Sequence, residues 1–378
     1  MHKTGSSSIQ QNLARAGKLY DWELLSINKR PNMGPVLHAM FNPNSHEWHW
    51  FKKKGYSVER LLKKADEWRQ KFAADVHNSN TSNFIISAET LSTFEKGSLI
   101  QLKCFLESIF DEICVIGYVR PPVAFKISMF QERIKQSAKK NIITIKGINI
   151  DYRIKFEKFD EVFGKERVLL KKFDPQNFFD RCIVKDFCKE VGIQLSENFS
   201  VIRVNERLSK EACGLLYAYR QFGPGYGVGR NVIKENIQLI RVLQKMKGSE
   251  LKFSASLVGE ILEENQMDIA WMEERLGVSL MENLDAIENV IHEEKDLLEI
   301  THRDCEAFAK CFQDAYKVKI SSELVPQSNP VELVQVAEML EFCRQIIRSK
   351  IKPKNRLIGI ILRRVGQFFT KKKERCLV

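Results

Sequence analysis

A lysine, a glycine and a row of hydroxyl side chains open the chain: Lys3, Thr4, Gly5, Ser6, Ser7 and Ser8. The residues that follow predict a helix over residues 6–16, so this loop leads into a helix N-terminus. Backbone N–H groups there attract anions, because several lack an acceptor within the helix and the helix dipole adds to their field. The loop is therefore a candidate site for a phosphate or sulfate group; the alternative is a capped helix with a run of serines.

A second pair of residues suits phosphate binding. Arg120 ends a continuous apolar run, residues 113–119, and Ser128 lies eight residues later, in the helix expected next. Ligands bind at the carboxyl ends of parallel strands, where a guanidinium and a hydroxyl can clamp a phosphate monoester. The alternative is an arginine paired with a surface carboxylate and a serine that faces solvent.

Two residues are candidates for a general base. Glu89 directly follows a predicted strand, residues 83–88, so we expect it at the same edge of the sheet as Arg120. A carboxylate there can accept a proton from a hydroxyl if partial burial raises its pKa; the alternative is a glutamate that stabilises a helix start. His38 is the rival base, although a single histidine among apolar neighbours is more often structural.

Strands and helices that alternate must position these residues. Continuous apolar runs predict buried strands over residues 83–88, 113–119 and 167–170. Apolar residues spaced by three and four predict helices over residues 57–76, 99–110 and 178–191, and Pro121-Pro122 begins another that extends to about residue 136. This alternation is typical of an α/β fold with a parallel sheet, whereas the pattern after about residue 205 is mainly helical.

Together, the opening loop and the Arg120-Pro121 motif with Ser128 resemble the sulfotransferases that use 3′-phosphoadenosine 5′-phosphosulfate (PAPS), most closely the bacterial carbohydrate sulfotransferases. Residues 168–192 also resemble a stretch of that family, and the resemblance covers roughly residues 1–200. It implies a P-loop-like parallel sheet flanked by helices over residues 1–204. A helical region on the acceptor side over residues 205–350 and a basic amphipathic tail over residues 351–378 would follow.

The resemblance also implies roles for individual residues. The loop from Lys3 to Ser7, continued by Ser8, would hold the 5′-phosphosulfate, and Arg120 and Ser128 would hold the 3′-phosphate. Sulfuryl transfer to a hydroxyl of a carbohydrate or glycoconjugate would need no metal. Glu89, or otherwise His38, would take the proton, and Lys3 would neutralise the departing phosphate.

One feature departs from the family pattern. The family's loop follows a central β-strand, whereas only Met1 and His2 precede Lys3. We therefore expect a sheet without its first central strand, with unpaired strand edges, poor stability and weak activity. A truncated, noncatalytic nucleotide-binding homologue is accordingly the alternative function. A P-loop kinase is less favoured, because no Gly-Lys-Ser/Thr loop and no magnesium carboxylate stand out.

Composition narrows the partners and the location. The 378 residues carry a formal net charge of +12, but ten basic side chains and a single acidic one fall within residues 350–378. We therefore expect no nucleic-acid partner. Scattered cysteines without a CxxC pair predict buried thiols in a reducing compartment. No apolar run long enough to span a membrane and no signal peptide stand out, so we expect a cytoplasmic protein.

Three further segments have weaker interpretations. The apolar and basic pattern of residues 357–373 suits either peripheral contact with an anionic membrane at its inner face or a terminal helix docked on the body. The glycine-rich residues 223–229 follow a predicted helix, which argues against a dinucleotide-binding loop. The two histidines of residues 46–50 lack further ligands at metal-binding spacing, so no metal site is expected.

Overall fold

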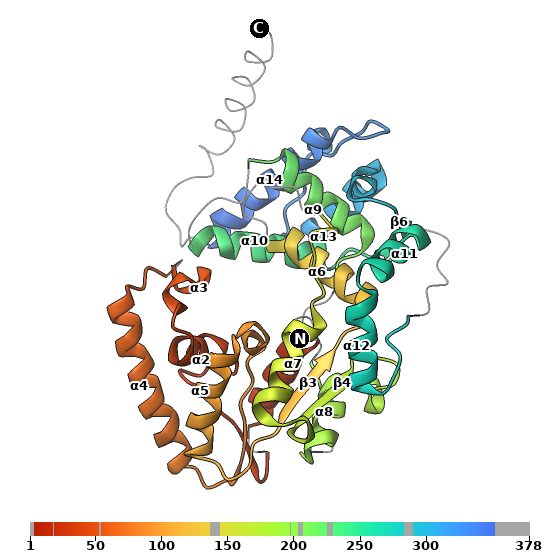
Figure 1. The fold of residues 1–378 in the computed structure, drawn as a ribbon. Helices are drawn as coiled ribbons and strands as arrows, with labels where there is room; N and C mark the ends of the chain where they lie inside the picture. The colour runs from red at the N-terminus through yellow and green to blue at the C-terminus, as the bar shows by residue number, and fades with distance from the viewer. Residues whose placement is uncertain are drawn as a thin grey trace. The chain divides into compact units, whose positions relative to one another are not determined.

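The computed structural model describes residues 4–17, 19–52, 54–136, 144–196, 198–202, 207–224, 230–282 and 290–351. It is an α/β structure with many helices and short parallel strand pairs (Figure 1). The chain divides into two compact units. Unit 1 comprises Met1–Phe125, Ile150–Glu206 and Ile261–Asn283, and unit 2 comprises Lys126–Asn149, Arg207–Glu260 and Leu284–Val378.

This division differs from the predicted boundary near residue 204. Residues 261–283 belong to unit 1 because the helix α12 (Gln266–Leu276) packs against α7 (Tyr152–Phe163) and β4 (Val168–Lys172). Arg275 of α12 is paired with Asp160 of α7, with its Nε atom 2.6 Å from a carboxylate oxygen. The helical pattern after residue 205 did not predict that residues 261–283 belong to unit 1.

Unit 1 combines helices with two parallel strand pairs. β1 (Trp22–Leu24) pairs with β2 (Asn83–Ile85), and β3 (Val115–Val119) pairs with β4 in the register Val115 to Val168 and Val119 to Lys172. Its other elements are α1 (Ser6–Ala16), α2 (Gly34–Phe41), α3 (His49–Lys52), α4 (Val58–His77), α5 (Lys96–Glu107), α7, α8 (Ile183–Val191), α12 and the 3-10 helices η1 (Ser45–Glu47), η2 (Glu89–Thr93), η3 (Lys165–Arg167) and η4 (Phe179–Arg181).

The predicted α/β class and parallel pairing are therefore confirmed, but the expected single sheet is not seen among the described residues. Each of the two strand pairs of unit 1 stands as a separate two-stranded sheet. Two of the predicted strands are also shorter than expected, since β2 ends at Ile85 and β3 begins at Val115, whereas β4 extends two residues beyond its predicted end. Figure 1 shows β3 and β4 as adjacent parallel arrows.

Local sequence explains where the helices begin and what they bury. Ser57 caps α4 by accepting a hydrogen bond from the Arg60 N–H, and the buried side chains of this helix recur at three and four residues. Prolines at the start of α6 (Pro122–Gln136) occupy positions whose N–H groups need no intrahelical acceptor. The helices predicted over residues 6–16, 57–76 and 122–136 are confirmed within one residue at each end.

Helices cover both faces of β3. Ile116 and Tyr118 belong to an apolar cluster with α1 and α8, whereas a Cβ atom at Gly117 would lie 3.5 Å from Phe156 of α7. Since successive residues of a strand point to opposite faces, α1 and α8 lie on one side of β3 and α7 on the other. This arrangement agrees with the continuous apolar run that predicted the strand.

Unit 2 is mainly helical, as expected for the later part of the chain. Its helices α9 (Lys210–Phe222) and α14 (Leu333–Ile351) pack together, and a short parallel pair joins β5 (Lys252–Phe253) to β6 (Val290–Ile291). Its other elements are α10 (Arg230–Leu243), α13 (His302–Tyr316), η5 (Glu294–Leu298), η6 (Ser322–Leu324) and parts of α6 and α11 (Ala255–Glu264).

The prediction of buried thiols holds for part of the cysteine set. Cys104 and Cys114 are exposed, in contrast to that prediction. Burial raises the pKa of the Cys188 thiol to about 11, which keeps that sulfur protonated at neutral pH. The buried cysteines are Cys188, Cys213, Cys305 and Cys343.

Candidate functional site

The loop before α1 has the backbone that its glycine predicts. Gly5 adopts a φ of 80°, in the left-handed region that residues with a Cβ atom rarely enter. A Cβ atom there would also lie 3.0 Å from Ile183. The Gly5 carbonyl accepts the Ile9 N–H at 3.0 Å, and no described side chain caps the helix. The first N–H groups of α1 therefore retain their capacity to bind an anion.

Two buried amide side chains fix α1 in unit 1. Gln10 donates to the Ser87 hydroxyl at 2.9 Å, which ties the helix to the segment after β2. Asn12 donates to the Ile202 carbonyl and accepts the Ile202 N–H at 2.8 Å. Because Gln10 links α1 to Ser87, just after β2, the loop before α1 is held near the carboxyl end of that strand.

Arg120 follows the last residue of β3 and is 6% exposed. Its guanidinium carbon lies 4.5 Å from the centre of the Phe173 ring, and Phe173 itself follows β4. The buried Tyr152 hydroxyl donates to the Arg120 carbonyl, which fixes the backbone at this point. The prediction that Arg120 stands at the carboxyl edge of a parallel strand is confirmed.

The Phe173 ring links Arg120 to the amino-terminal loop. A Cβ atom built on Gly5 would lie 3.5 Å from Cε2 of Phe173, and the Arg120 guanidinium packs over the same ring. Both contacts lie within unit 1. The two groups predicted to bind opposite ends of one dianionic ligand are thus each in contact range of a single aromatic side chain.

A carboxylate occupies the start of α6 beside Arg120. Glu282 accepts the Val123 N–H at 2.9 Å and the Ala124 N–H at 3.1 Å. Burial raises the pKa of Glu282, while these two N–H groups and the charges of Arg120 and Lys172 act in the opposite direction. Nothing in the sequence near residue 282 marked this role, because the contact joins segments about 160 residues apart.

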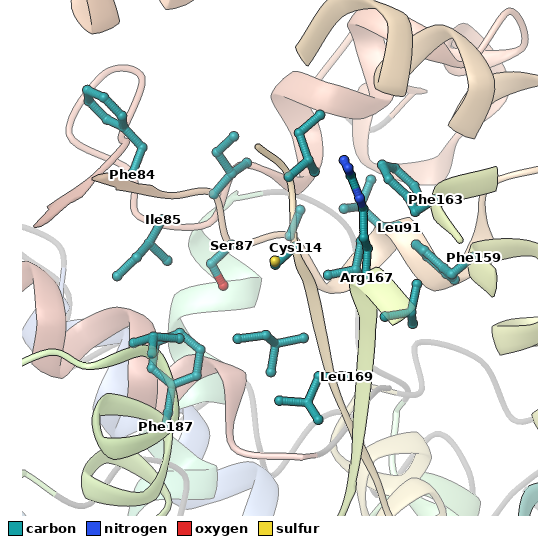
Figure 2. Close-up of a pocket in the computed structure, with 18 of the residues that line it drawn as sticks. Phe84, Ile85, Ser87, Leu91, Cys114, Phe159, Phe163, Arg167, Leu169 and Phe187 are labelled. Atoms are coloured by element: carbon teal, nitrogen blue, oxygen red, sulfur yellow. The ribbon is translucent and has the colours of Figure 1, made fainter. Parts of the chain in front are cut away.

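A cavity of about 640 Å³ lies in unit 1 between β2 and β3 (Figure 2). Thr4 and Ser6 of the loop line it together with Glu89, the first residue of η2. The predicted base and the predicted anion-binding loop therefore share one cavity. Glu89 is half-buried, as a carboxylate that acts as a base would require.

The rival base His38 lies elsewhere in unit 1. It does not line this cavity, and its ring stacks on Trp48 with the ring centres 4.4 Å apart. Burial lowers the pKa of His38 to about 4, and its Nδ1 atom has no hydrogen-bond partner among the described residues. These contacts are those of a packed core residue.

Two predicted ligand residues are not placed beside the others. Lys3 lies outside the described residues, as do residues 225–229 of the glycine-rich segment and the tail from residue 352. Ser128 is half-buried on α6 in the part of the chain that belongs to unit 2, whereas Arg120 belongs to unit 1. The clamp formed by Arg120 and Ser128 therefore stays a prediction.

A charged cluster that local sequence patterns did not predict joins α8 to β3, β4 and the segment between β4 and α8. Asp186 of α8 accepts a hydrogen bond from the Tyr118 hydroxyl at 2.7 Å and one from Lys171 at 3.0 Å. It also accepts the Phe179 N–H at 3.1 Å. Although burial acts to raise it, these bonds leave the pKa of Asp186 below its usual value, so the carboxylate stays charged and anchors the segment between β4 and α8.

Neither a metal-ion site nor a membrane-spanning helix is present among the described residues. No group of three or more histidine, cysteine, aspartate or glutamate side chains in them is arranged to hold a metal ion. None of the helices in these ranges combines the length and apolar character that crossing a bilayer requires.

Comparison with known proteins gives one distant relative. The chain is 23% identical over 258 residues to an uncharacterized ATP-binding protein of Methanocaldococcus jannaschii. The match covers 68% of this chain and 58% of that relative's length. No family model matches the chain. No solved structure matches it either.

Proposed function

We propose that this protein is a PAPS-dependent sulfotransferase that acts on a hydroxyl of a carbohydrate or glycoconjugate. The observation that carries the proposal is the placement of Gly5 and Arg120 against the same ring, that of Phe173. The donor has a phosphate at its 3′ position and a phosphosulfate at its 5′ position. Helix N–H groups suit one of these anionic groups and a guanidinium suits the other.

The transfer is an in-line displacement at sulfur. The acceptor oxygen forms a bond to sulfur while the bond from sulfur to the phosphate oxygen breaks, so the products are a sulfate ester and 3′,5′-ADP. The α1 N–H groups and Ser7 hold the nonreacting oxygens, and Lys3 balances the charge that develops on the departing phosphate. Arg120 and Ser128 hold the 3′-phosphate and keep the donor in register.

Glu89 takes the proton of the acceptor hydroxyl in this proposal. Its position in the same cavity as Thr4 and Ser6 favours it over His38, which packs in the core. The Glu89→Gln variant is expected to lower turnover by about a hundredfold or more and to leave the affinity for 3′,5′-ADP unchanged, because general bases contribute about 10²–10⁴-fold to rate. Glu59→Gln, an exposed residue of α4, is the matched control. Near-normal turnover of the Glu89 variant would remove this assignment.

The alternative is a noncatalytic nucleotide-binding protein, and the name of the distant relative favours ATP as its ligand. A P-loop kinase is a second, less favoured alternative. The order of residues in the opening loop argues against the kinase, because Lys3 precedes Gly5 instead of following a glycine. ATP also lacks the 3′-phosphate that Arg120 is proposed to bind.

Calorimetric titration separates these functions. The sulfotransferase proposal predicts that 3′,5′-ADP binds without Mg²⁺ and at least about tenfold more tightly than ATP, a difference of about 1.4 kcal/mol. Tighter binding of ATP, or a requirement for Mg²⁺, would favour the alternative. Incubation with radiolabelled PAPS and a cell-envelope glycan extract then identifies the acceptor.

Arg120 provides the sharpest variant for the same titration. Loss of a charge-assisted contact to phosphate in Arg120→Met is expected to weaken 3′,5′-ADP binding by about ten- to a hundredfold. Binding of ATP should change far less. Arg153→Met, which removes an exposed arginine paired with Glu157, serves as the control and should bind both nucleotides normally.

A further inference from the structure

The first N–H groups of α6 are bound by a carboxylate from a distant part of the chain. Pro121-Pro122 has no N–H group, so Val123 and Ala124 supply the first N–H groups of this helix. Both donate to Glu282, at 2.9 Å and 3.1 Å. Glu282 therefore fills the position at which the start of α6 would bind an anion.

Two cations from neighbouring strands act on the same carboxylate. Lys172 ends β4 and is paired with Val119, the last residue of β3, which the buried Arg120 follows. The charges of Arg120 and Lys172 both act to lower the pKa of Glu282. Lys172 Nζ also donates to the Ser279 carbonyl at 2.9 Å, three residues before Glu282. Two N–H groups and two cations form a set that suits an anion with two negative charges.

A carboxylate fits this set less well than a phosphate does. Burial is the largest influence on Glu282 and leaves its pKa above the usual value, so the ionised form is less favoured there than in water. A carboxylate also has a single negative charge, whereas a phosphate monoester has about 1.5 to 2 at neutral pH. A phosphate thus gains more from Arg120 and Lys172, and its binding returns Glu282 to water, where the carboxylate is fully hydrated.

We propose that the start of α6, with Arg120 and Lys172, binds a phosphate monoester, and that Glu282 is an internal competitor that occupies this position until the phosphate displaces it. The inference rests on the proposed function where it identifies this group as the 3′-phosphate of the donor. The phosphate oxygens take the Val123 and Ala124 N–H groups, and the Glu282 side chain turns to solvent. The apparent affinity for the phosphate is then lower than the intrinsic one, by the fraction of molecules in which the position is open.

Asp268 provides a matched control, because it caps another helix of unit 1 by the same pair of bonds. Its carboxylate accepts the Tyr152 N–H and, at 2.8 Å, the Arg153 N–H at the start of α7. Glu282→Gln and Asp268→Asn each weaken the capping of two helix N–H groups, so both should lower the melting temperature by a few degrees. Only the Glu282 variant opens the start of α6. A capping role alone predicts equal phosphate affinity in the two variants.

Titration calorimetry of the unaltered protein and both variants tests the competition. The probes are 3′,5′-ADP, ATP and inorganic phosphate, all without Mg²⁺. Glu282→Gln is expected to bind 3′,5′-ADP about tenfold more tightly than the unaltered protein does, a gain of about 1.4 kcal/mol, and Asp268→Asn is expected to stay within about twofold. A gain for neither 3′,5′-ADP nor inorganic phosphate in the Glu282 variant would overturn the inference.

The same titrations separate this inference from the proposed function. If the unaltered protein prefers 3′,5′-ADP to ATP and Glu282→Gln gives no gain for any probe, the sulfotransferase proposal stands and the competitor is excluded. If ATP binds more tightly than 3′,5′-ADP and Glu282→Gln still gains about tenfold for inorganic phosphate, the competitor stands and the sulfotransferase proposal fails.

A measurement on the unaltered protein decides the question if Glu282→Gln does not fold. Carbodiimide couples glycine ethyl ester to carboxyl groups that solvent reaches, and peptide mass spectrometry follows Glu282 and Asp268 in one sample. A high concentration of inorganic phosphate should raise the labelling of Glu282 severalfold relative to Asp268, because the displaced carboxylate is exposed. Asp268 corrects for reagent that the phosphate consumes. A constant ratio between the two carboxylates would contradict displacement.

Discussion

Two regions of this molecule treat buried polar groups in opposite ways. In unit 2, Glu235 is 1% exposed, yet its carboxylate is paired with Arg344 at 2.8 Å and with Arg348 at 3.4 Å. Arg344 also binds Glu341, which accepts a hydrogen bond from the Tyr219 hydroxyl. In unit 1, by contrast, two strand edges face a cavity of about 640 Å³.

The contrast teaches that the cavity is not a sign of a generally loose chain. Four polar side chains on α9, α10 and α14 are paired with one another, as buried polar groups in folded proteins usually are. They are Tyr219, Glu235, Glu341 and Arg344. Three residues of the proposed site, Thr4, Ser6 and Glu89, line this cavity.

The largest expected effect concerns the paired charges of unit 2. Arg344→Met leaves Glu235 and Glu341 without their shared partner, so the free energy of unfolding should fall by about 3–5 kcal/mol. Arg348→Met is the control, because Arg348 is half-exposed and its pair should contribute about 1 kcal/mol or less. Denaturant unfolding measures both, and equal losses would break the comparison.

Truncation of a leucine should also lower the free energy of unfolding more in unit 2 than beside the cavity of unit 1. Leu340 is fully buried on α14, so Leu340→Ala is expected to cost about 2–5 kcal/mol. Leu169 lines the cavity and is 40% exposed, so Leu169→Ala should cost about 1 kcal/mol or less, because little packing is lost beside an empty space. A large loss in the Leu169 variant would contradict this difference between the two regions.

His38 predicts a pH dependence of stability in unit 1. Its pKa is about 4 in the folded protein and 6.5 in an unfolded chain, so the unfolded state binds more protons between these values. Stability from this group is complete above pH 6.5 and is lost as the pH falls toward 4, with a limit of about 3 kcal/mol.

His38→Phe keeps an aromatic ring against Trp48 and removes the titration. The difference in unfolding free energy between this variant and the unaltered protein should therefore change across pH 4 to 6.5 and stay constant above it. A constant difference throughout would mean that His38 is accessible to water and not part of the packed region.

The smallest effect on stability is expected at the amino-terminal loop. Gly5→Ala should cost about 1–2 kcal/mol, because the backbone is left-handed there and the new Cβ atom meets Ile183. Gly97→Ala, on α5 with open space around it, should be neutral or stabilise by up to about 1 kcal/mol. Thermal unfolding distinguishes the two, and a neutral Gly5 variant would exclude the backbone geometry on which the anion site depends.

Sequence reasoning located the elements of unit 1 because their signals are local. The apolar run before Arg120 predicts a strand, and apolar residues spaced by three and four predict a helix over residues 57–76. Neither prediction depends on contacts with other parts of the chain. The same reasoning placed Gly5 before a helix N-terminus and Arg120 and Glu89 at strand ends. These positions depend on few residues. The structure has Gly5 and Arg120 as predicted, whereas Glu89 lies four residues beyond the end of β2, as the first residue of η2.

Contacts between distant segments could not be predicted in the same way. Glu282 reaches the start of α6, and Asp186 reaches Tyr118, through the tertiary fold alone. The packing of α12 in unit 1 is likewise set by tertiary contacts, and helical spacing in the sequence does not predict which unit a helix joins. His38 is a further case, because its packing against the rings of Trp48 and Phe94 is also set by the tertiary fold.

A crystal structure with bound 3′,5′-ADP tests the central claim most directly. The account predicts one phosphate within hydrogen-bond distance of the first N–H groups of α1 and the other in contact with the Arg120 guanidinium, with Phe173 between them. A nucleotide bound by only one of these two groups, or bound elsewhere, would contradict it.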